Sequence, residues 1–122
     1  MTATQRMAWW SRSYWSRCSE YRELAIEAAE AEASYRMVKA QAVLTARHGQ
    51  DGRGSMDLAN AQADADPMVA EACRRYKVTA ALADAQQKLL RQLDSAVQAC
   101  RTEVASDREA DKMAAAGMDG SA

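Results

Sequence analysis

The strongest constraint on the fold is a repeat of apolar or small residues at every third or fourth position, in two long stretches of the chain. In the first stretch the repeat consists of Tyr21, Leu24, Ala28, Ala31, Tyr35, Val38, Ala42 and Thr45. In the second it consists of Val69, Ala72, Tyr76, Thr79, Ala83, Gln86, Leu90, Leu93, Val97, Cys100 and Val104. This spacing describes a stripe along one face of a helix, which we call the seam. Two seams with a glycine-rich break between them predict an all-α fold, a long antiparallel helical hairpin with a short intervening helix.

Two helices cover only one face of each other, so the hairpin is expected to leave apolar surface that needs a partner. We therefore predict that the 122-residue chain assembles into a homo-oligomeric helical bundle or ring. The side chains expected at the interface between copies are aromatic or aliphatic: Trp10, Tyr14, Tyr21, Leu82, Leu89, Leu90, Leu93 and Val97.

Local signals predict where each helix begins and ends within a single helical domain over residues 1–106. The first helix is expected over about 5–48, followed by a loop over 49–54, since Gly49, Gly52 and Gly54 favour backbone angles that stop a helix. Ser55 can cap a short helix over about 56–62. Asp66 and Pro67 suit the cap and first position of a helix over about 67–106. Residues 107–122 alternate charges and then become rich in Ala, Gly and Ser, which predicts a frayed or disordered tail.

The composition argues against an enzyme, a cofactor or a metal site. The chain has one His, no Gly-rich phosphate loop between a strand and a helix, and no His or Cys cluster at metal-ligand spacing. Glu23, Glu27 and Glu30 share a helix face and could hold a divalent ion, but a solvated face is the better explanation, because bundle metal sites normally also supply His ligands.

The expected location is the cytoplasm, or the host cell cytoplasm if a phage encodes the chain. Three dispersed cysteines fit a reducing compartment. No window approaches the roughly 20 apolar residues of a membrane span, so no membrane contact is expected.

Charge is banded along the first helix, although the net charge of the chain is only -1. An acidic block of Glu23, Glu27, Glu30 and Glu32 precedes a basic region. In an antiparallel hairpin the basic residues of both helices come to one end, where they could form a ridge that binds DNA phosphates. The members of this predicted ridge are Arg36, Lys39, Arg47, Arg53, Arg74, Arg75 and Lys77. Scattered solvated charges are the alternative.

Residues 6–17 hold all three tryptophans, interleaved with Arg and Ser. Trp10 continues the seam backwards, so packing predicts a structural role for it. Trp9 and Trp15 lie off the seam and are candidates for stacking on the bases of single-stranded DNA. Trp, Tyr and Arg also dominate protein interfaces, so the segment could instead anchor a protein partner.

Several short motifs occur in a characteristic order between Glu20 and Arg101. They are Lys39-Ala40, Gly52-Arg53-Gly54, Ser55-Met56-Asp57, Ala63-Asp64, an Asp66 ten residues before Tyr76, and a Leu-rich segment over 82–97. In this order and spacing the chain resembles the UvsY family of phage recombination mediators. These proteins help load a RecA-like recombinase onto single-stranded DNA that is coated by a single-stranded DNA-binding protein.

The resemblance implies a helical fold, a ring-like homo-oligomer and a contact of Lys39 with single-stranded DNA. Gln41 stands where the family pattern has a second basic residue. The expected function is therefore a non-enzymatic recombination mediator that binds single-stranded DNA. The alternative is a phage structural or assembly protein, a helical scaffold or chaperone that acts through protein–protein contacts.

Overall fold

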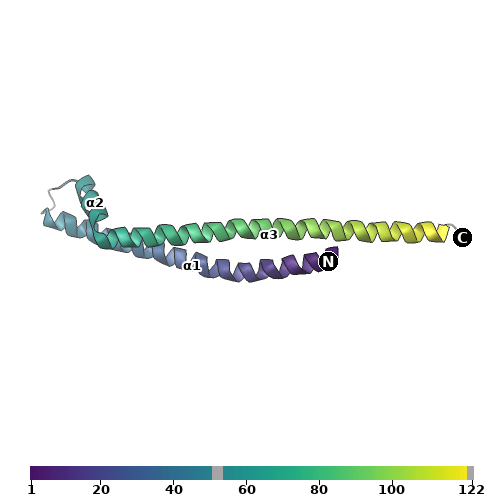
Figure 1. The fold of residues 1–122 in the computed structure, drawn as a ribbon. Helices are drawn as coiled ribbons and strands as arrows, with labels where there is room; N and C mark the ends of the chain where they lie inside the picture. The colour runs from purple at the N-terminus through teal and green to yellow at the C-terminus, as the bar shows by residue number, and fades with distance from the viewer. Residues whose placement is uncertain (51–53, 121–122) are drawn as a thin grey trace. The chain divides into compact units, whose positions relative to one another are not determined.

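The computed structural model describes residues 1–50 and 54–120, with side chains through residue 117, and this part of the chain confirms the all-α prediction. Its helices are α1 (Ala3–Gly49), α2 (Met56–Ala65) and α3 (Pro67–Gly120) (Figure 1). The helix bounds of α1 agree with the prediction within two residues, and α3 begins at Pro67 as predicted. Gly52 and Arg53 of the predicted loop lie outside the described residues.

Side-chain caps explain the helix starts. Thr2 and Gln5 form a reciprocal pair, in which the Thr2 Oγ1 accepts from the Gln5 backbone N–H at 3.1 Å and the Gln5 Oε1 accepts from the Thr2 N–H at 2.8 Å. This is a capping box, and it starts α1. The Ser55 Oγ accepts from the Leu58 N–H at 3.0 Å, as expected for the cap of α2.

Asp66 separates α2 from α3. Its backbone N–H donates to the Ala63 carbonyl at 3.0 Å, which closes α2, and its Oδ1 accepts from the Met68 N–H at 2.8 Å, which caps α3. Pro67 follows at the first helical position, where the missing amide hydrogen costs nothing. One residue thus ends one helix and begins the next.

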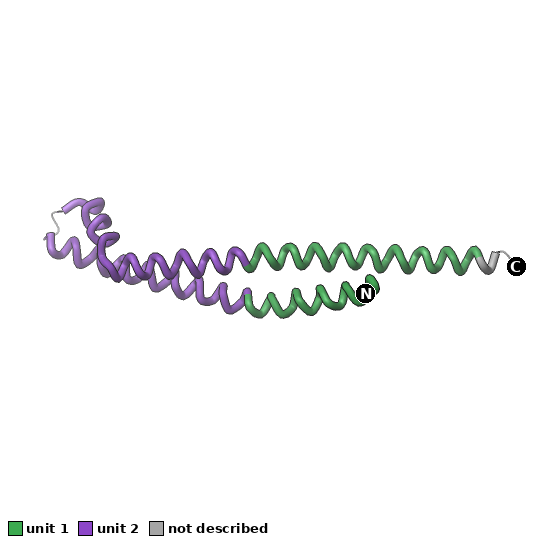
Figure 2. Tube along the Cα trace, viewed as in Figure 1, with its two compact units in different colours: residues 1–20, 86–122 green, residues 21–85 purple. Residues whose placement is uncertain are grey.

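Contacts divide the chain into two compact units (Figure 2). Unit 1 contains residues 1–20 and 86–122, and unit 2 contains residues 21–85. In unit 1, Arg6 pairs with Glu103, and the Gln86 Nε2 donates to the Arg17 carbonyl at 3.4 Å, so α1 and α3 run antiparallel there. A residue of the seam contacts only the residues directly opposite it on the other helix. Contacts therefore group each segment of α1 with the segment of α3 beside it, and each group forms one unit.

The core of unit 2 is built from small residues. Tyr35 of α1 stacks on Tyr76 of α3, with ring centroids 5.7 Å apart and planes 17° apart. The buried residues of unit 2 are Ala31, Ala59, Ala63 and Val69. Because three of these are alanines, the helix backbones approach closely, and the core is thin.

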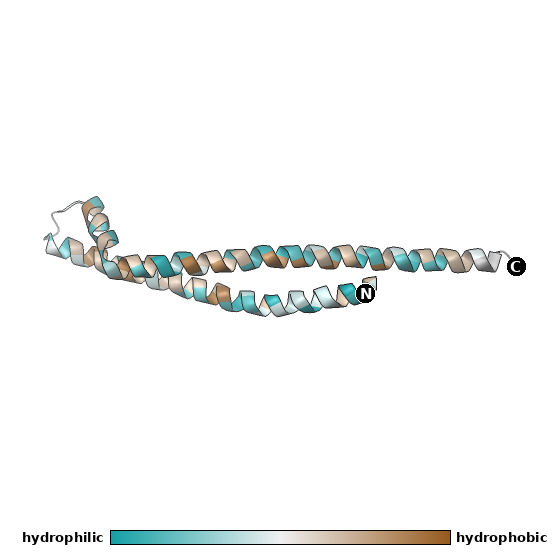
Figure 3. Cartoon of the chain, in the orientation of Figure 1, coloured by the Kyte–Doolittle hydropathy of each residue, from teal (hydrophilic) through white to brown (hydrophobic). Residues whose placement is uncertain are grey.

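The predicted seam agrees with the burial pattern. All of its residues in both stretches are buried or half-buried except Thr45. In unit 1 the buried residues are Ala3, Leu93, Val97, Cys100 and Val104. No polar or charged residue of the described part is buried. Apolar and polar residues accordingly alternate along the helices (Figure 3).

The carboxyl-terminal segment differs from the prediction of a frayed tail from residue 107. The structure continues α3 to Gly120, and the side chains of residues 107–117 are exposed. The segment has good helix formers, no Pro, and opposite charges three residues apart, Arg108 with Asp111 and Glu109 with Lys112. Local preference therefore supports helix there without packing. Similarly, α2 runs to Ala65 rather than to about residue 62.

Candidate nucleic-acid interface

Unit 2 has an open pocket with basic residues in its lining, to which α1, α2 and α3 all contribute. Its volume is about 560 Å³. Tyr35 and Lys39 lie one turn apart on α1, and Cys73 and Lys77 lie one turn apart on α3, so each pair faces the same side of its helix. Asp64 comes from α2, and Val69, Ala70 and Arg74 complete the lining. The sequence prediction placed Lys39, Arg74 and Lys77 in one ridge, and the structure brings these three to one pocket.

Lys39 pairs with a carboxylate and lies near an aromatic ring. Its Nζ lies 3.3 Å from the Asp64 Oδ1, and the hydrogen bond with Asp64, followed by the charge of that carboxylate, raises the pKa of Lys39. The same Nζ lies 5.9 Å from the centroid of the Tyr35 ring, a cation–π distance. The Lys39 side chain is 33% exposed and that of Asp64 is 58% exposed, so water and anions can reach this ion pair.

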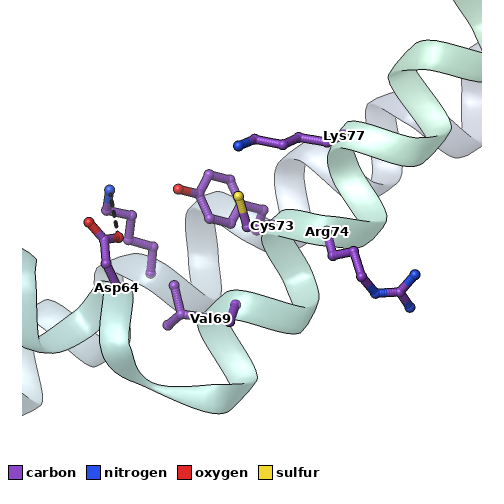
Figure 4. A pocket seen from close by; sticks show the side chains of 8 residues that line it. Asp64, Val69, Cys73, Arg74 and Lys77 are labelled. Atoms are coloured by element: carbon purple, nitrogen blue, oxygen red, sulfur yellow. Dashed lines mark ion pairs between the residues drawn. The ribbon is translucent and has the colours of Figure 1, made fainter.

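Arg74 and Lys77 differ in how they meet the pocket. Figure 4 shows the Arg74 guanidinium pointing away from Asp64, whereas Lys77 extends over the same side as Cys73. Arg74 pairs with Glu71, Nη2 to Oε1 at 2.6 Å and Nε to Oε2 at 3.0 Å. This pair raises the pKa of Arg74 and lowers the pKa of Glu71, in both cases chiefly through the hydrogen bonds between the two side chains.

The remaining described residues of the predicted ridge do not line this pocket. Arg36 pairs with Glu32 at 2.6 Å on α1, and the Arg47 Nη1 donates to the Met56 Sδ at 3.9 Å. Arg75 lines a second pocket, with Pro67 and Met68. Arg53 lies outside the described residues. The predicted ridge is thus several local groups of cations, and three of its members, Arg36, Lys39 and Arg74, pair with carboxylates.

The tryptophan segment belongs to unit 1, whereas the pocket described above belongs to unit 2. Trp9 is 47% exposed and Trp15 is 72% exposed, whereas Trp10 is half-buried. Trp9 packs edge-on against Trp10 at 4.7 Å, and Trp15 packs edge-on against Tyr14 at 5.7 Å. The hydrogen bond with Cys18 is the main cause that raises the pKa of Tyr14. The segment therefore presents Trp9 and Trp15 to solvent, each braced by a neighbouring ring.

Two of the residues expected at the interface between copies, Leu93 and Val97, are buried within a single chain. Leu93 is 7% exposed and Val97 is 6% exposed, because both pack inside unit 1. Trp10, Tyr14, Tyr21, Leu89 and Leu90 are half-buried, and Leu82 is 50% exposed. A single chain thus already removes most of Leu93 and Val97 from water. The assignment of these two residues to an interface between copies stays a prediction.

Asp64 is the site residue that the sequence reasoning did not identify as a partner of Lys39. It was noted only as part of an Ala-Asp motif. Its position depends on the rotation of α2 against α1, and no local pattern reports that rotation. Cys73 was likewise expected only as a small core residue, yet it is half-buried and lines the pocket.

The described residues contain no group of three His, Cys, Asp or Glu side chains that could hold a metal ion, and Glu23, Glu27 and Glu30 do not form one. No helix in the same part of the chain is both long and apolar enough to cross a membrane.

Comparisons with models of known protein families, with curated proteins and with solved structures find no match. The resemblance to the UvsY family therefore depends on the sequence motifs alone.

Proposed function

We propose that the chain is a non-enzymatic recombination mediator that binds single-stranded DNA and helps load a RecA-like recombinase in the cytoplasm. The observation that supports this proposal is that Lys39 of α1 and Lys77 of α3 line one open pocket together with Tyr35, whose ring stacks on Tyr76. Cations from two helices next to aromatic rings suit a nucleic-acid backbone with its bases.

The carboxylate partners of these cations do not prevent phosphate binding. The Lys39–Asp64 and Arg74–Glu71 pairs are exposed, and exposed ion pairs are worth little, since water screens them. A phosphate can therefore replace Asp64 as the partner of Lys39 at small cost. Asp64 would act as a competitor that weakens non-specific binding of anions.

Self-assembly supplies the affinity that one pocket lacks. A single pocket neutralises only a few phosphates, but linked pockets on a homo-oligomer would act at high effective concentration along one strand. Such an oligomer would loosen the coat of single-stranded DNA-binding protein and present the strand to recombinase. The exposed Trp9 and Trp15 could add stacking on bases.

The direct test is fluorescence anisotropy of a labelled single-stranded oligonucleotide at several salt concentrations. The double substitution Lys39→Ala with Lys77→Ala should weaken binding about tenfold or more and flatten the salt dependence, because phosphate contacts are lost. The matched control is Lys112→Ala, an exposed lysine of unit 1. Equal affinities of the double variant and the control would refute this site.

If Asp64 competes with phosphate for Lys39, removing its charge should raise the affinity for the oligonucleotide in the same assay, whereas loss of the lysines should lower it. Asp64→Asn keeps the shape of the side chain but removes its charge, so phosphate no longer competes with a carboxylate for Lys39. Affinity should rise about two- to fivefold. Weaker binding in this variant would mean that Asp64 positions Lys39 rather than masking it.

A second candidate is a phage structural or assembly protein that acts through protein–protein contacts. The observation that favours it is the number of large apolar side chains left in water, among them Trp15, Met37 and Leu44. Under this alternative the chain would form oligomers or complexes with proteins but would not shift the anisotropy of the oligonucleotide.

A further inference from the structure

α1 carries a second apolar stripe, on the face opposite its seam. The stripe consists of Ile26, Ala29, Ala33, Met37, Ala40 and Leu44, and all six residues are exposed. Ile26 is 52% exposed, Met37 is 63% exposed and Leu44 is 68% exposed. The spacing of three and four follows one line along the helix, so these side chains form a continuous surface within unit 2 rather than scattered contacts.

A shallow groove lies beside the second half of this stripe. Its volume is about 530 Å³, its apolar part comes from Ala40, Val43 and Leu44, and Arg36 and Lys39 line it as well. A partner for this groove should offer an apolar side chain with carboxylates close by. The first half of the stripe has that composition, because Ile26 lies between Glu23 and Glu27, with Glu30 one turn further on.

The charge banding selects one orientation of such a partner. Residues 23–32 of α1 carry the carboxylates Glu23, Glu27, Glu30 and Glu32, and residues 36–47 carry the cations Arg36, Lys39 and Arg47. If two copies pack their stripes antiparallel, the acidic half of each faces the basic half of the other. A parallel pair would place like charges together.

We propose that a second copy of the chain docks antiparallel on this stripe, with residues 33 and 37 near a two-fold axis. Ile26 of one copy then lies in the groove beside Leu44 of the other, and the contact repeats by symmetry. The interface buries the same surface on both copies and closes as a pair. This inference rests on the self-association that the proposed function assumes, but it places the contact on α1 instead of on the leucines of α3.

The location of the contact can be tested by sedimentation of the full chain at several concentrations. Met37→Glu places a charge at the centre of the interface and should yield monomers. The matched control is Leu82→Glu, which adds the same charge to an exposed apolar position of α3 and should leave the mass of the assembly unchanged. Leu44→Glu serves as a second stripe variant, and circular dichroism checks that each variant stays helical.

The orientation has its own test. Glu30 and Gln41 are both exposed and lie eleven residues apart, about three turns, so they share one flank of the stripe. In the antiparallel pair Gln41 faces Glu30 of the other copy. Gln41→Glu should therefore weaken the pair several-fold, and adding Glu30→Lys should restore it. In a parallel pair the two positions would be about 16 Å apart along the helices, and the second change would not restore association.

The outcomes separate this inference from the proposed function. Monomers of the unchanged chain at about 100 µM, far above the concentration at which a specific pair should form, would overturn self-association itself. An assembly that survives Met37→Glu but is lost with Leu82→Glu would move the interface to α3 and overturn only this inference. Restoration by the Gln41 and Glu30 pair supports the antiparallel arrangement whether or not the chain binds DNA.

Discussion

At the scale of the residue, all charged groups of the described part lie at the surface, and their ion pairs are exposed. Examples are Arg17 with Glu20 at 3.1 Å and Arg36 with Glu32 at 2.6 Å, both within α1. Exposed pairs at this spacing contribute little to stability. They can be exchanged for ligand contacts at low cost, which is what a phosphate-binding surface requires.

The Glu71–Arg74 pair predicts a small pH dependence of stability. Its hydrogen bonds lower the pKa of Glu71 from 4.5, so the folded chain favours the ionised form. This contribution is complete above the unfolded value of 4.5 and is lost as the pH falls through the lower folded value. Glu71→Gln should lower the melting temperature by about 1 °C near neutral pH and should have no effect in strong acid.

A double-mutant cycle provides the control for this prediction. In a chain that already carries Arg74→Ala, the Glu71→Gln change should have no effect on the melting temperature near neutral pH, because the partner is gone. A drop that persists in that background would show that Glu71 stabilises the helix in some other way.

At the scale of the element, α1 in unit 2 has two apolar faces of different character. The seam faces α3 and contains Ala31 and Tyr35, whereas the opposite stripe contains Met37 and Leu44 and faces solvent. If α1 had only one apolar face, contact with α3 would cover that face and leave no apolar surface exposed. The second face is the surface on which we propose that a second copy docks.

Two leucines of α3 provide a matched test of the seam. Leu93 is 7% exposed, so Leu93→Ala removes buried methyl groups and should lower the free energy of unfolding by about 2 to 5 kcal/mol. Leu82 is 50% exposed, and Leu82→Ala should cost well under half as much. Urea unfolding followed by circular dichroism measures both. Similar losses for the two variants would contradict the arrangement of unit 1 in the structure.

At the scale of the whole molecule, DNA affinity and assembly should be linked. The proposed pocket at Lys39 and Lys77 offers few cations, and an assembly would align several such pockets along a strand. The proposed pair through α1 and the proposed DNA site at Lys39 lie on the same unit, so association would bring two pockets into one particle.

Met37→Glu therefore should weaken binding of a long single-stranded oligonucleotide, although Met37 carries no charge that contacts phosphate. The expected loss is tenfold or more, because effective concentration is lost with the partner copy. An oligonucleotide too short to reach two pockets should bind the variant and the unchanged chain almost equally. Anisotropy with the two lengths makes this comparison, and equal losses for both would indicate direct damage to the site.

The sequence by itself determined the helices and the seam of this protein. Asp66 with Pro67 specified the start of α3 through backbone hydrogen bonding, and spacing alone placed Val69 and Leu93 on the buried face. The capping box of Thr2 and Gln5 is equally local and could have fixed the start of α1. These features depend on residues two to four positions apart, so no knowledge of the rest of the chain is needed.

Only the tertiary structure decided which of those helical faces meet. The pairing of Lys39 with Asp64 depends on how α2 is rotated against α1, and the burial of Leu93 and Val97 depends on which segment of α1 lies opposite them. Met37 and Leu44 are exposed for the same reason. α1 buries the seam face in unit 2, so the opposite face, which carries these two residues, remains in solvent. The register and rotation of one helix against another arise from packing between segments that are distant in the sequence. Helical spacing is compatible with several registers and rotations, and only the three-dimensional structure shows which one the chain adopts.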